Sequence, residues 1–218
     1  MKYFTKFYLR IHFLVLLMLL QMAVCAQPDR ENLSLDQKVQ QFLDKSRSDW
    51  HNMNVPYQDG KVLYDLIINN KYTAALEIGT STGHSTIWIA WAMSKTGGKV
   101  TTIEINESRH RQALENIREA GLQNYVDARL ADAHELVKEL KGPFDFIFSD
   151  ADKDWYVQYF KDVAPKLKTG GCFTAHNVLN GFSGTKEFVD YVKSLENYDT
   201  TINRSSSSGI SISYKRSE

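Results

Sequence analysis

This chain of 218 residues has few cysteines, few long apolar runs and no excess of charge of either sign. It has two cysteines, and its 26 basic and 26 acidic residues leave a formal net charge of zero. That balance argues against a dedicated nucleic-acid-binding protein, which is usually basic. With 43% apolar and 24% charged residues, the composition excludes a disordered or collagen-like chain. The length suits one domain with a sizeable core.

The N-terminus has the pattern of a secretory signal peptide. Residues 1–10 carry three bases and no acid, and residues 13–20 form the longest apolar run in the chain. Small residues at Val24 and Ala26 then predict cleavage before Gln27.

Two alternatives to an ordinary secretory signal peptide remain open for residues 1–26. Cys25 can be the lipidated residue of a lipoprotein, or the apolar run can remain as an anchor, although it is short for a spanning helix. After removal of residues 1–26, we expect a linker at 27–33, a domain at 34–218 and a single cysteine, Cys172, with no internal disulfide. Taking three bases and no acid from 26 and 26 leaves a net charge of −3.

Apolar periodicity predicts two helices before an alternating α/β domain. A capping box at Ser34 and Gln37 precedes a helix that should run to about Trp50, and a second helix is expected at 59–69. From Tyr72 onward, strand and helix patterns alternate, which implies a parallel sheet covered on both faces. The last two strands flank a serine-rich turn and suggest an antiparallel pair. Strands are expected at 74–78, 99–105, 126–131, 144–149, 171–176, 199–203 and 210–214, and helices at 84–95, 107–120, 133–141, 153–167 and 184–195.

A glycine-containing loop joins the first strand of the alternating region to its helix. The run from Leu76 to Gly83 enters that loop, and Glu104 ends the next strand. Ligands of such sheets bind at the carboxyl ends of the strands, where a carboxylate can accept hydrogen bonds from ribose hydroxyls. The loop is a poor match to the dinucleotide fingerprint, so a nicotinamide enzyme and a methyltransferase using S-adenosylmethionine both remain. Glu77 weakly favours the methyltransferase, because a carboxylate there would repel a pyrophosphate and attract an ammonium or sulfonium.

Polar side chains also follow the fourth and fifth predicted strands. Asp150 stands at the tip of one strand, and His176 and Asn177 stand at the tip of the other. Lys153 lies three residues after Asp150, so a helical turn would direct it into the same cleft. One carboxylate, one imidazole and one amide oxygen can supply half of the shell of a divalent cation. On spacing alone, His176 and Asn177 fit a strand end without a ligand somewhat better than a metal site.

Short motifs occur in order over nearly all of residues 50–218. They are Met53-Asn54-Val55, Leu76-Glu77-Ile78-Gly79, Gly83-His84-Ser85, Thr102-Ile103-Glu104-Ile105-Asn106, Ala131-Asp132-Ala133, Asp150-Ala151-Asp152-Lys153 and His176-Asn177-Val178-Leu179. In these motifs the chain resembles the small metal-dependent O-methyltransferases, the family of catechol O-methyltransferase and caffeoyl-CoA O-methyltransferase. The resemblance implies a Rossmann-like sheet of seven strands, mostly parallel with an antiparallel last strand. It also implies methyl transfer from S-adenosylmethionine to a hydroxyl of a small, aromatic or catechol-like acceptor.

The resemblance assigns roles to individual residues. It places the methionine end of the cofactor on Val55, Glu77, Gly79, Thr80 and Ser85, the ribose on Glu104, and the adenine beside Ile105, Ala133 and His134. It makes Lys153 the general base, lets Asp150 touch both cofactor and metal, and makes Asp150, His176 and Asn177 the metal ligands. The metal would bind two adjacent substrate oxygens and favour the ionised hydroxyl.

The chain departs from the family at two places. The family has aspartate at position 176, and the histidine here either shifts the preference from Mg²⁺ toward Mn²⁺ and related ions or leaves no metal bound. The turn at 204–209 holds no acid for the second hydroxyl of a catechol. Trp50, His51 and Trp155 are candidates for an aromatic wall or for packing. A metal-independent methyltransferase, a non-catalytic binder of an adenosyl ligand and a nicotinamide oxidoreductase therefore remain as alternatives.

The predicted compartment conflicts with the predicted cofactor. S-adenosylmethionine is made in the cytosol, so a periplasmic or secreted enzyme would need a supply, whereas an uncleaved anchor would hold the domain inside. We expect a small-molecule acceptor, and no nucleic-acid partner because the chain without its leader is slightly acidic. Membrane contact is expected only through the leader, and a homodimer stays open.

Overall fold

The computed structural model describes residues 33–47 and 53–216. The predicted leader, most of the predicted linker, and Trp50 and His51 lie outside these residues, so expectations about them stay predictions. Within the described part, no helix is both long and apolar enough to cross a membrane. The fold described below is that of the unit beginning at Leu35.

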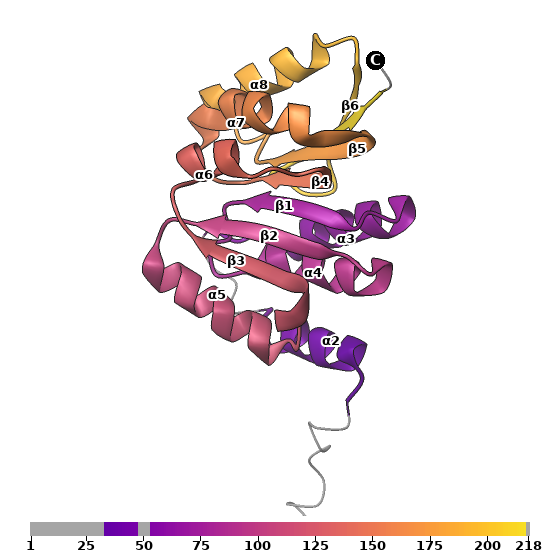
Figure 1. The fold of residues 1–218 in the computed structure, drawn as a ribbon, viewed down its shortest axis with the longest axis vertical. Coiled ribbons are helices and arrows are strands. Elements are labelled where there is room, and N and C mark those ends of the chain that lie inside the picture. Colours follow the sequence, from indigo (N-terminus) through magenta and orange to yellow (C-terminus); the bar gives the residue numbers. More distant parts are fainter. Residues whose placement is uncertain (1–32, 48–52, 217–218) are drawn as a thin grey trace, which may run out of the picture. The chain divides into compact units, whose positions relative to one another are not determined.

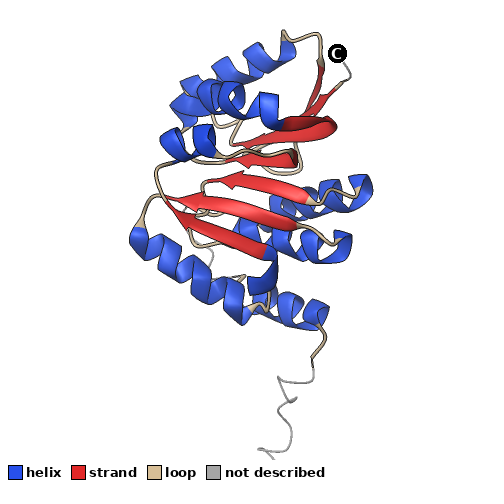
Figure 2. Ribbon diagram, in the orientation of Figure 1, coloured by secondary structure: helices blue, strands red, loops and turns tan. Residues whose placement is uncertain are grey.

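Seven strands form one sheet. Its arrangement with the surrounding helices can be followed in Figures 1 and 2. The strands are β1 (Ala74–Ile78), β2 (Lys99–Glu104), β3 (Val126–Leu130), β4 (Phe144–Ser149), β5 (Leu167–His176), β6 (Tyr198–Asn203) and β7 (Ile210–Lys215). Their order is β3-β2-β1-β4-β5-β7-β6, with β1 to β5 parallel and β7 antiparallel to both β5 and β6. This topology confirms the predicted α/β sheet and its antiparallel final pair.

Helices cover both faces of this sheet. They are α2 (Leu35–Lys45), α3 (Tyr57–Asn70), α4 (His84–Thr96), α5 (Glu107–Glu119), α6 (Ala133–Glu139), α7 (Tyr156–Val163) and α8 (Ser183–Lys193). One apolar core contains buried residues of α2 to α5, and the other contains buried residues of α6 to α8. β4 is buried along its whole length because its alternate residues enter the two cores, with Phe146 in one and Ile147 in the other. Burial on both faces explains the continuous apolar runs in the sequence.

The helix predicted at 153–167 is wrong in its extent. The structure has a 3-10 turn at Lys153–Trp155, then α7, then a second 3-10 turn at Ala164–Lys166. Pro165 lacks an N–H and cannot continue an α-helix, so α7 ends at Val163. β5 consequently begins four residues earlier than expected, and its pairing with β4 shifts register near its start.

The first predicted helix is also too long. α2 ends at Lys45 and is followed by a turn at 46–47 instead of continuing toward Trp50. The other expected helices and strands occur within two residues of their predicted bounds. Boundaries of this kind depend on contacts outside the segment, so apolar periodicity places them only approximately.

A glycine lets α3 pack closely on α4. A Cβ at Gly60 would lie 2.2 Å from Cδ1 of Trp88, a distance that no side chain tolerates. The indole of Trp88 also meets the ring of Tyr57 edge-on, with 4.8 Å between the ring centroids. The missing side chain thus sets how near α3 can come to the sheet, and with it the position of Asp59, the neighbour of Gly60.

We expect Gly60→Ala to lower the free energy of unfolding by about 1–3 kcal/mol, because the added methyl overlaps the Trp88 ring. The gain in helix propensity, about 1 kcal/mol, only partly offsets this loss. Urea denaturation measures the change. Lys61→Ala at the exposed next residue is the matched control and should stay within about 0.5 kcal/mol of the wild type. Equal stability of Gly60→Ala and wild type would contradict the packing argument.

Candidate active site

A cleft of about 620 Å³ lies where the carboxyl ends of β1, β2, β4 and β5 meet. This is the edge of the sheet at which the sequence predicts a ligand. Predicted residues at both ends of the cleft contribute to its lining, so one cavity joins the expected cofactor end to the expected chemical end. They are Gly79, Glu104, Ile105, Ala133, His134, Asp150, Lys153, His176 and Asn177.

Two loops touch at the floor of the cleft because one of them carries a glycine. Gly79 has a φ of +102°, and a Cβ there would lie 2.9 Å from the backbone nitrogen of Ala151. The loop after β1 then folds over Glu104, whose Oε2 accepts a hydrogen bond from the Ser81 N–H at 2.7 Å. Its Oε1 accepts one from the Asn106 N–H at 2.8 Å. Both carboxylate oxygens are therefore fixed in place, and each keeps lone-pair capacity for a further donor.

Four of the predicted cofactor residues are not exposed to the cleft. Val55, Glu77, Thr80 and Ser85 are buried and are absent from the cleft lining. Glu77 accepts hydrogen bonds from the hydroxyls of Thr86, on α4, and Thr102, on β2. Burial raises the pKa of Glu77 to about 7 despite these contacts. In this structure Glu77 joins β1, β2 and α4, and direct contact of these four residues with a cofactor stays a prediction.

The third part of the lining is aromatic. The His134 ring stacks on Tyr159, with centroids 5.6 Å apart and planes 11° apart, and its centroid lies 4.0 Å from that of Trp155. Asp132 holds the same imidazole through an Oδ1···Nδ1 contact of 3.0 Å. Trp155 therefore packs on His134, at the end predicted to take adenine, and is not part of the cleft lining. Ile105 is exposed on the same cleft.

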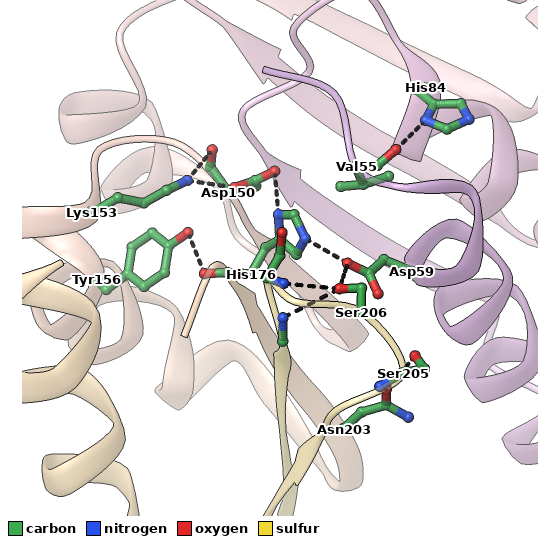
Figure 3. Close-up of polar contacts among 12 residues, drawn as sticks. Val55, Asp59, His84, Asp150, Lys153, Tyr156, His176, Asn203, Ser205 and Ser206 are labelled. Atoms are coloured by element: carbon green, nitrogen blue, oxygen red, sulfur yellow. Dashed lines mark hydrogen bonds and ion pairs between the residues drawn. The ribbon is translucent and has the colours of Figure 1, made fainter. Parts of the chain in front are cut away.

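At the chemical end, Asp150 lies between Lys153 and His176 (Figure 3). The 3-10 turn directs the Lys153 side chain back into the cleft as predicted, and its Nζ donates to Asp150 Oδ1 and to the Asp150 carbonyl oxygen at 3.0 Å. Nδ1 of His176 lies 3.2 Å from Asp150 Oδ2. The predicted convergence of these three residues is confirmed, and Asn177 lines the same cleft.

A second carboxylate, which no sequence pattern predicts, lies behind His176. Asp59, on α3, is fully buried and places its Oδ2 2.8 Å from Nε2 of His176. The same oxygen accepts a hydrogen bond of 2.7 Å from the Ser206 hydroxyl, in the turn between β6 and β7 (Figure 3). Asp59 stands in the first turn of α3, where an acid is common and does not by itself indicate a site. Because 117 positions separate Asp59 from His176, no local pattern could pair them.

Both ring nitrogens of His176 face carboxylate oxygens, an arrangement that favours the imidazolium because only that form donates a hydrogen bond on both sides. Burial alone would favour the neutral ring, but Asp150 and Asp59 outweigh it and raise the pKa of His176 to about 9. Burial likewise opposes ionisation of Asp150, yet His176 and Lys153 keep the pKa of that carboxyl below its usual value. The cluster is therefore made of alternating acids and bases.

The predicted metal ligands do not fit a divalent cation in this arrangement. An imidazolium has no lone pair for a metal, and the two oxygens of Asp150 already accept from His176 and Lys153. Among the described residues, no three or more His, Cys, Asp or Glu side chains form a group that could hold a metal ion. Metal binding at Asp150, His176 and Asn177 stays a prediction that this donor set does not favour.

The pKa of His176 predicts how stability depends on pH. The value rises from 6.5 to about 9 on folding, so the stabilisation is fully present below pH 6.5 and is lost as the pH rises through about 9. We expect the stability advantage of wild type over His176→Gln to shrink across that window by up to about 3 kcal/mol. Urea titrations at several pH values measure this, with His110→Gln, at a histidine on α5 outside the cleft, as the control. A difference that is constant with pH would contradict the imidazolium.

Comparison with known proteins agrees with this fold and cleft. Residues 28–196 match a family model described as O-methyltransferase. The chain is 41% identical over 108 residues to "Catechol O-methyltransferase" of Niastella koreensis, covering 48% of each chain. It is 36% identical over 138 residues to "Caffeoyl-CoA O-methyltransferase" of Medicago sativa, covering 60% of this chain and 55% of that one. The chain thus spans about half the length of the curated relatives it matches.

Solved structures extend the likeness to most of the chain. The O-methyltransferase from Bacillus cereus in complex with SAH is 26% identical with a TM-score of 0.72, covering 89% of this chain and 94% of that one. TomG from Streptomyces achromogenes, in complex with SAM, shares the fold at 23% identity and a TM-score of 0.69, covering 88% and 92%. The family model covers well over half of the sequence, and the chain belongs to the O-methyltransferase family.

Proposed function

We propose that this protein transfers a methyl group from S-adenosylmethionine to a hydroxyl of a small aromatic molecule. The observation that carries the proposal is the single cleft that joins the fixed Glu104 carboxylate to the Lys153–Asp150 pair. Family membership supports the reaction class, and the Bacillus cereus relative in complex with SAH supports the cofactor.

The cofactor end of the cleft would bind the adenosyl group. Glu104 would accept hydrogen bonds from the ribose hydroxyls, and Ile105, Ala133 and His134 would contact the adenine. Gly79 leaves the floor open to the ligand, while Val55, Glu77, Thr80 and Ser85 would shape the methionine end. S-adenosylmethionine supplies a methyl group on a sulfonium that is already activated for transfer, so the protein has mainly to align the reactants.

At the chemical end we assign proton removal to Lys153. Its side chain is 20% exposed and that of Asp150 is 12% exposed, so bulk water has limited access to the pair. Asp150 orients the Lys153 Nζ at the cleft, where it would accept the proton of the acceptor hydroxyl. No step is assigned to a metal, because the donor set described above does not fit one.

Apolar side chains at the rim would contact the ring of the acceptor. Met53 and Phe182 line the cleft and are 66% and 47% exposed, so both side chains are accessible to a ligand in the cleft. Asn180 and Ser208 lie in the same lining and offer polar contacts. This mixture suits a small aromatic alcohol better than a nucleic acid, which would call for basic residues.

The place of action is a separate part of the proposal. The pattern of residues 1–26 supports export after cleavage, or membrane anchoring if the segment is retained. Export would require a source of S-adenosylmethionine outside the cytosol.

We expect the protein to bind S-adenosylhomocysteine and not NAD, and Glu104→Gln to weaken that binding roughly 10–100-fold through loss of charge-assisted hydrogen bonds. Isothermal titration calorimetry measures both. Glu107→Gln, on the first turn of α5, is the matched control and should bind as the wild type does. Binding of NAD in preference to S-adenosylhomocysteine would reject the methyltransferase in favour of a nicotinamide enzyme.

We expect Lys153→Met to lower kcat for methyl transfer by about 10²–10⁴-fold, the usual contribution of a general base. The affinity for S-adenosylhomocysteine should change little. Transfer of labelled methyl to a panel of phenols and catechols measures the rate, with Lys186→Met on the exposed face of α8 as the control. Full activity of Lys153→Met would remove Lys153 from the mechanism.

A further inference from the structure

The polar cluster at the chemical end of the cleft is complete without an added ion. Along the row Asp59, His176, Asp150 and Lys153, each charged side chain contacts one of opposite sign. With Lys153 and His176 protonated, the charges of these two cations and two carboxylates sum to zero. Asp59 and His176 are 1% and 4% exposed at their side chains, so this balance lies out of reach of solvent screening. A divalent cation placed here would add two positive charges to a site that is already neutral.

The hydrogen bonds of the His176 ring also argue against a bound metal. A carboxylate behind a metal-bound histidine is common, and the Asp59 contact alone would suit such a site. The other ring nitrogen distinguishes this site from a metal site. Nδ1 lies 3.2 Å from Asp150 Oδ2, and while it donates a hydrogen bond there it has no lone pair for a metal. The remaining oxygen of Asp150 accepts from Lys153. A metal would have to displace a proton from His176 and compete with Lys153 for Asp150.

We infer that the His176 imidazolium, held by Asp59, takes the place of the divalent cation, so that methyl transfer proceeds without a metal. The inference rests on the proposed function. In the step itself Lys153 first releases one ammonium proton to solvent. The acceptor oxygen then forms a bond to the methyl carbon, the carbon–sulfur bond breaks with its electron pair going to sulfur, and the hydroxyl proton goes to the neutral amine of Lys153. His176 fixes Asp150, and Asp150 fixes Lys153, so His176 and Asp59 are positioning residues.

The fold holds this histidine from behind. Ser206 donates to the same Asp59 oxygen that contacts His176, and the backbone N–H of Ser208 donates to the Ser206 hydroxyl at 3.1 Å. Gly60, the next residue on α3, packs directly against Trp88 of α4. The serine-rich turn therefore acts as a clamp on Asp59, and the ring of His176 stays with Nδ1 toward Asp150.

The absence of a chelating metal changes the class of acceptor. A metal-assisted enzyme binds two adjacent oxygens of its substrate, whereas this cluster offers one base and no open coordination positions. One hydroxyl at Lys153 is sufficient, with the ring held by Met53 and Phe182 at the rim. The acceptor class is thus a phenol with a single reactive hydroxyl, and a neighbouring hydroxyl is not required.

The test is a titration of the full chain with Mn²⁺, after dialysis against chelator, with free Mn²⁺ followed by electron paramagnetic resonance with and without S-adenosylhomocysteine. We expect no saturable binding to the wild type. The double variant His176→Asp/Asp59→Asn replaces the imidazolium by a ligand carboxylate and removes the buried like charge. It should bind Mn²⁺ at least about 10–100-fold more tightly than the wild type. His110→Asp, which adds an acid on α5, is the matched control and should resemble the wild type.

Further measurements distinguish a failure of the metal-free mechanism from a failure of the proposed function. Calorimetry in chelator should show S-adenosylhomocysteine bound as tightly as in Mn²⁺, and methyl transfer should be the same in both. Stoichiometric binding of Mn²⁺ by the wild type, or loss of transfer in chelator, overturns the metal-free mechanism while leaving the methyltransferase intact. Failure to bind S-adenosylhomocysteine in either condition overturns the proposed function and the inference together. These measurements on the wild type stand even if the double variant does not fold.

Discussion

The imidazole of His176 is held between two buried carboxylates, and the chemical end of the cleft depends on that contact. Burying a charge is costly unless an opposite charge and hydrogen bonds accompany it. Here Asp59 and Asp150 supply both, on opposite sides of one ring. The arrangement needs α3, the ends of β4 and β5, and the turn between β6 and β7 to meet at one point. A change in any of them would leave a buried charge without its partner.

Close backbone approach supplies the geometry that this contact needs. Gly79 lets the loop after β1 lie against the loop after β4, and Gly60 lets α3 lie against α4. The first approach sets the cleft floor between Glu104 and Asp150, and the second sets the depth of Asp59. A side chain at either glycine would push apart elements that carry functional groups. Packing and chemistry are therefore linked through two positions that have no side chain.

Membership of the O-methyltransferase family accounts for the shared sheet and for the position of the cleft. A fold by itself does not determine the chemistry of a site, which depends on the side chains present. Position 176 is an example, because the histidine there contacts both Asp59 and Asp150 and balances the charge of Asp150. Family membership thus indicates the reaction class, whereas the cluster around His176 bears on how the acceptor is activated.

The sequence by itself determined the alternating α/β pattern, the edge of the sheet where the cleft lies, and the nearness of Asp150, Lys153 and His176. Each follows from local periodicity or from residues that end adjacent parallel strands. Tertiary structure alone decided that Glu77 is buried against α4 and β2, and that Asp59 pairs with His176. The reason is physical, because a contact between residues 117 positions apart arises from how whole helices pack on a sheet. No local pattern records such packing.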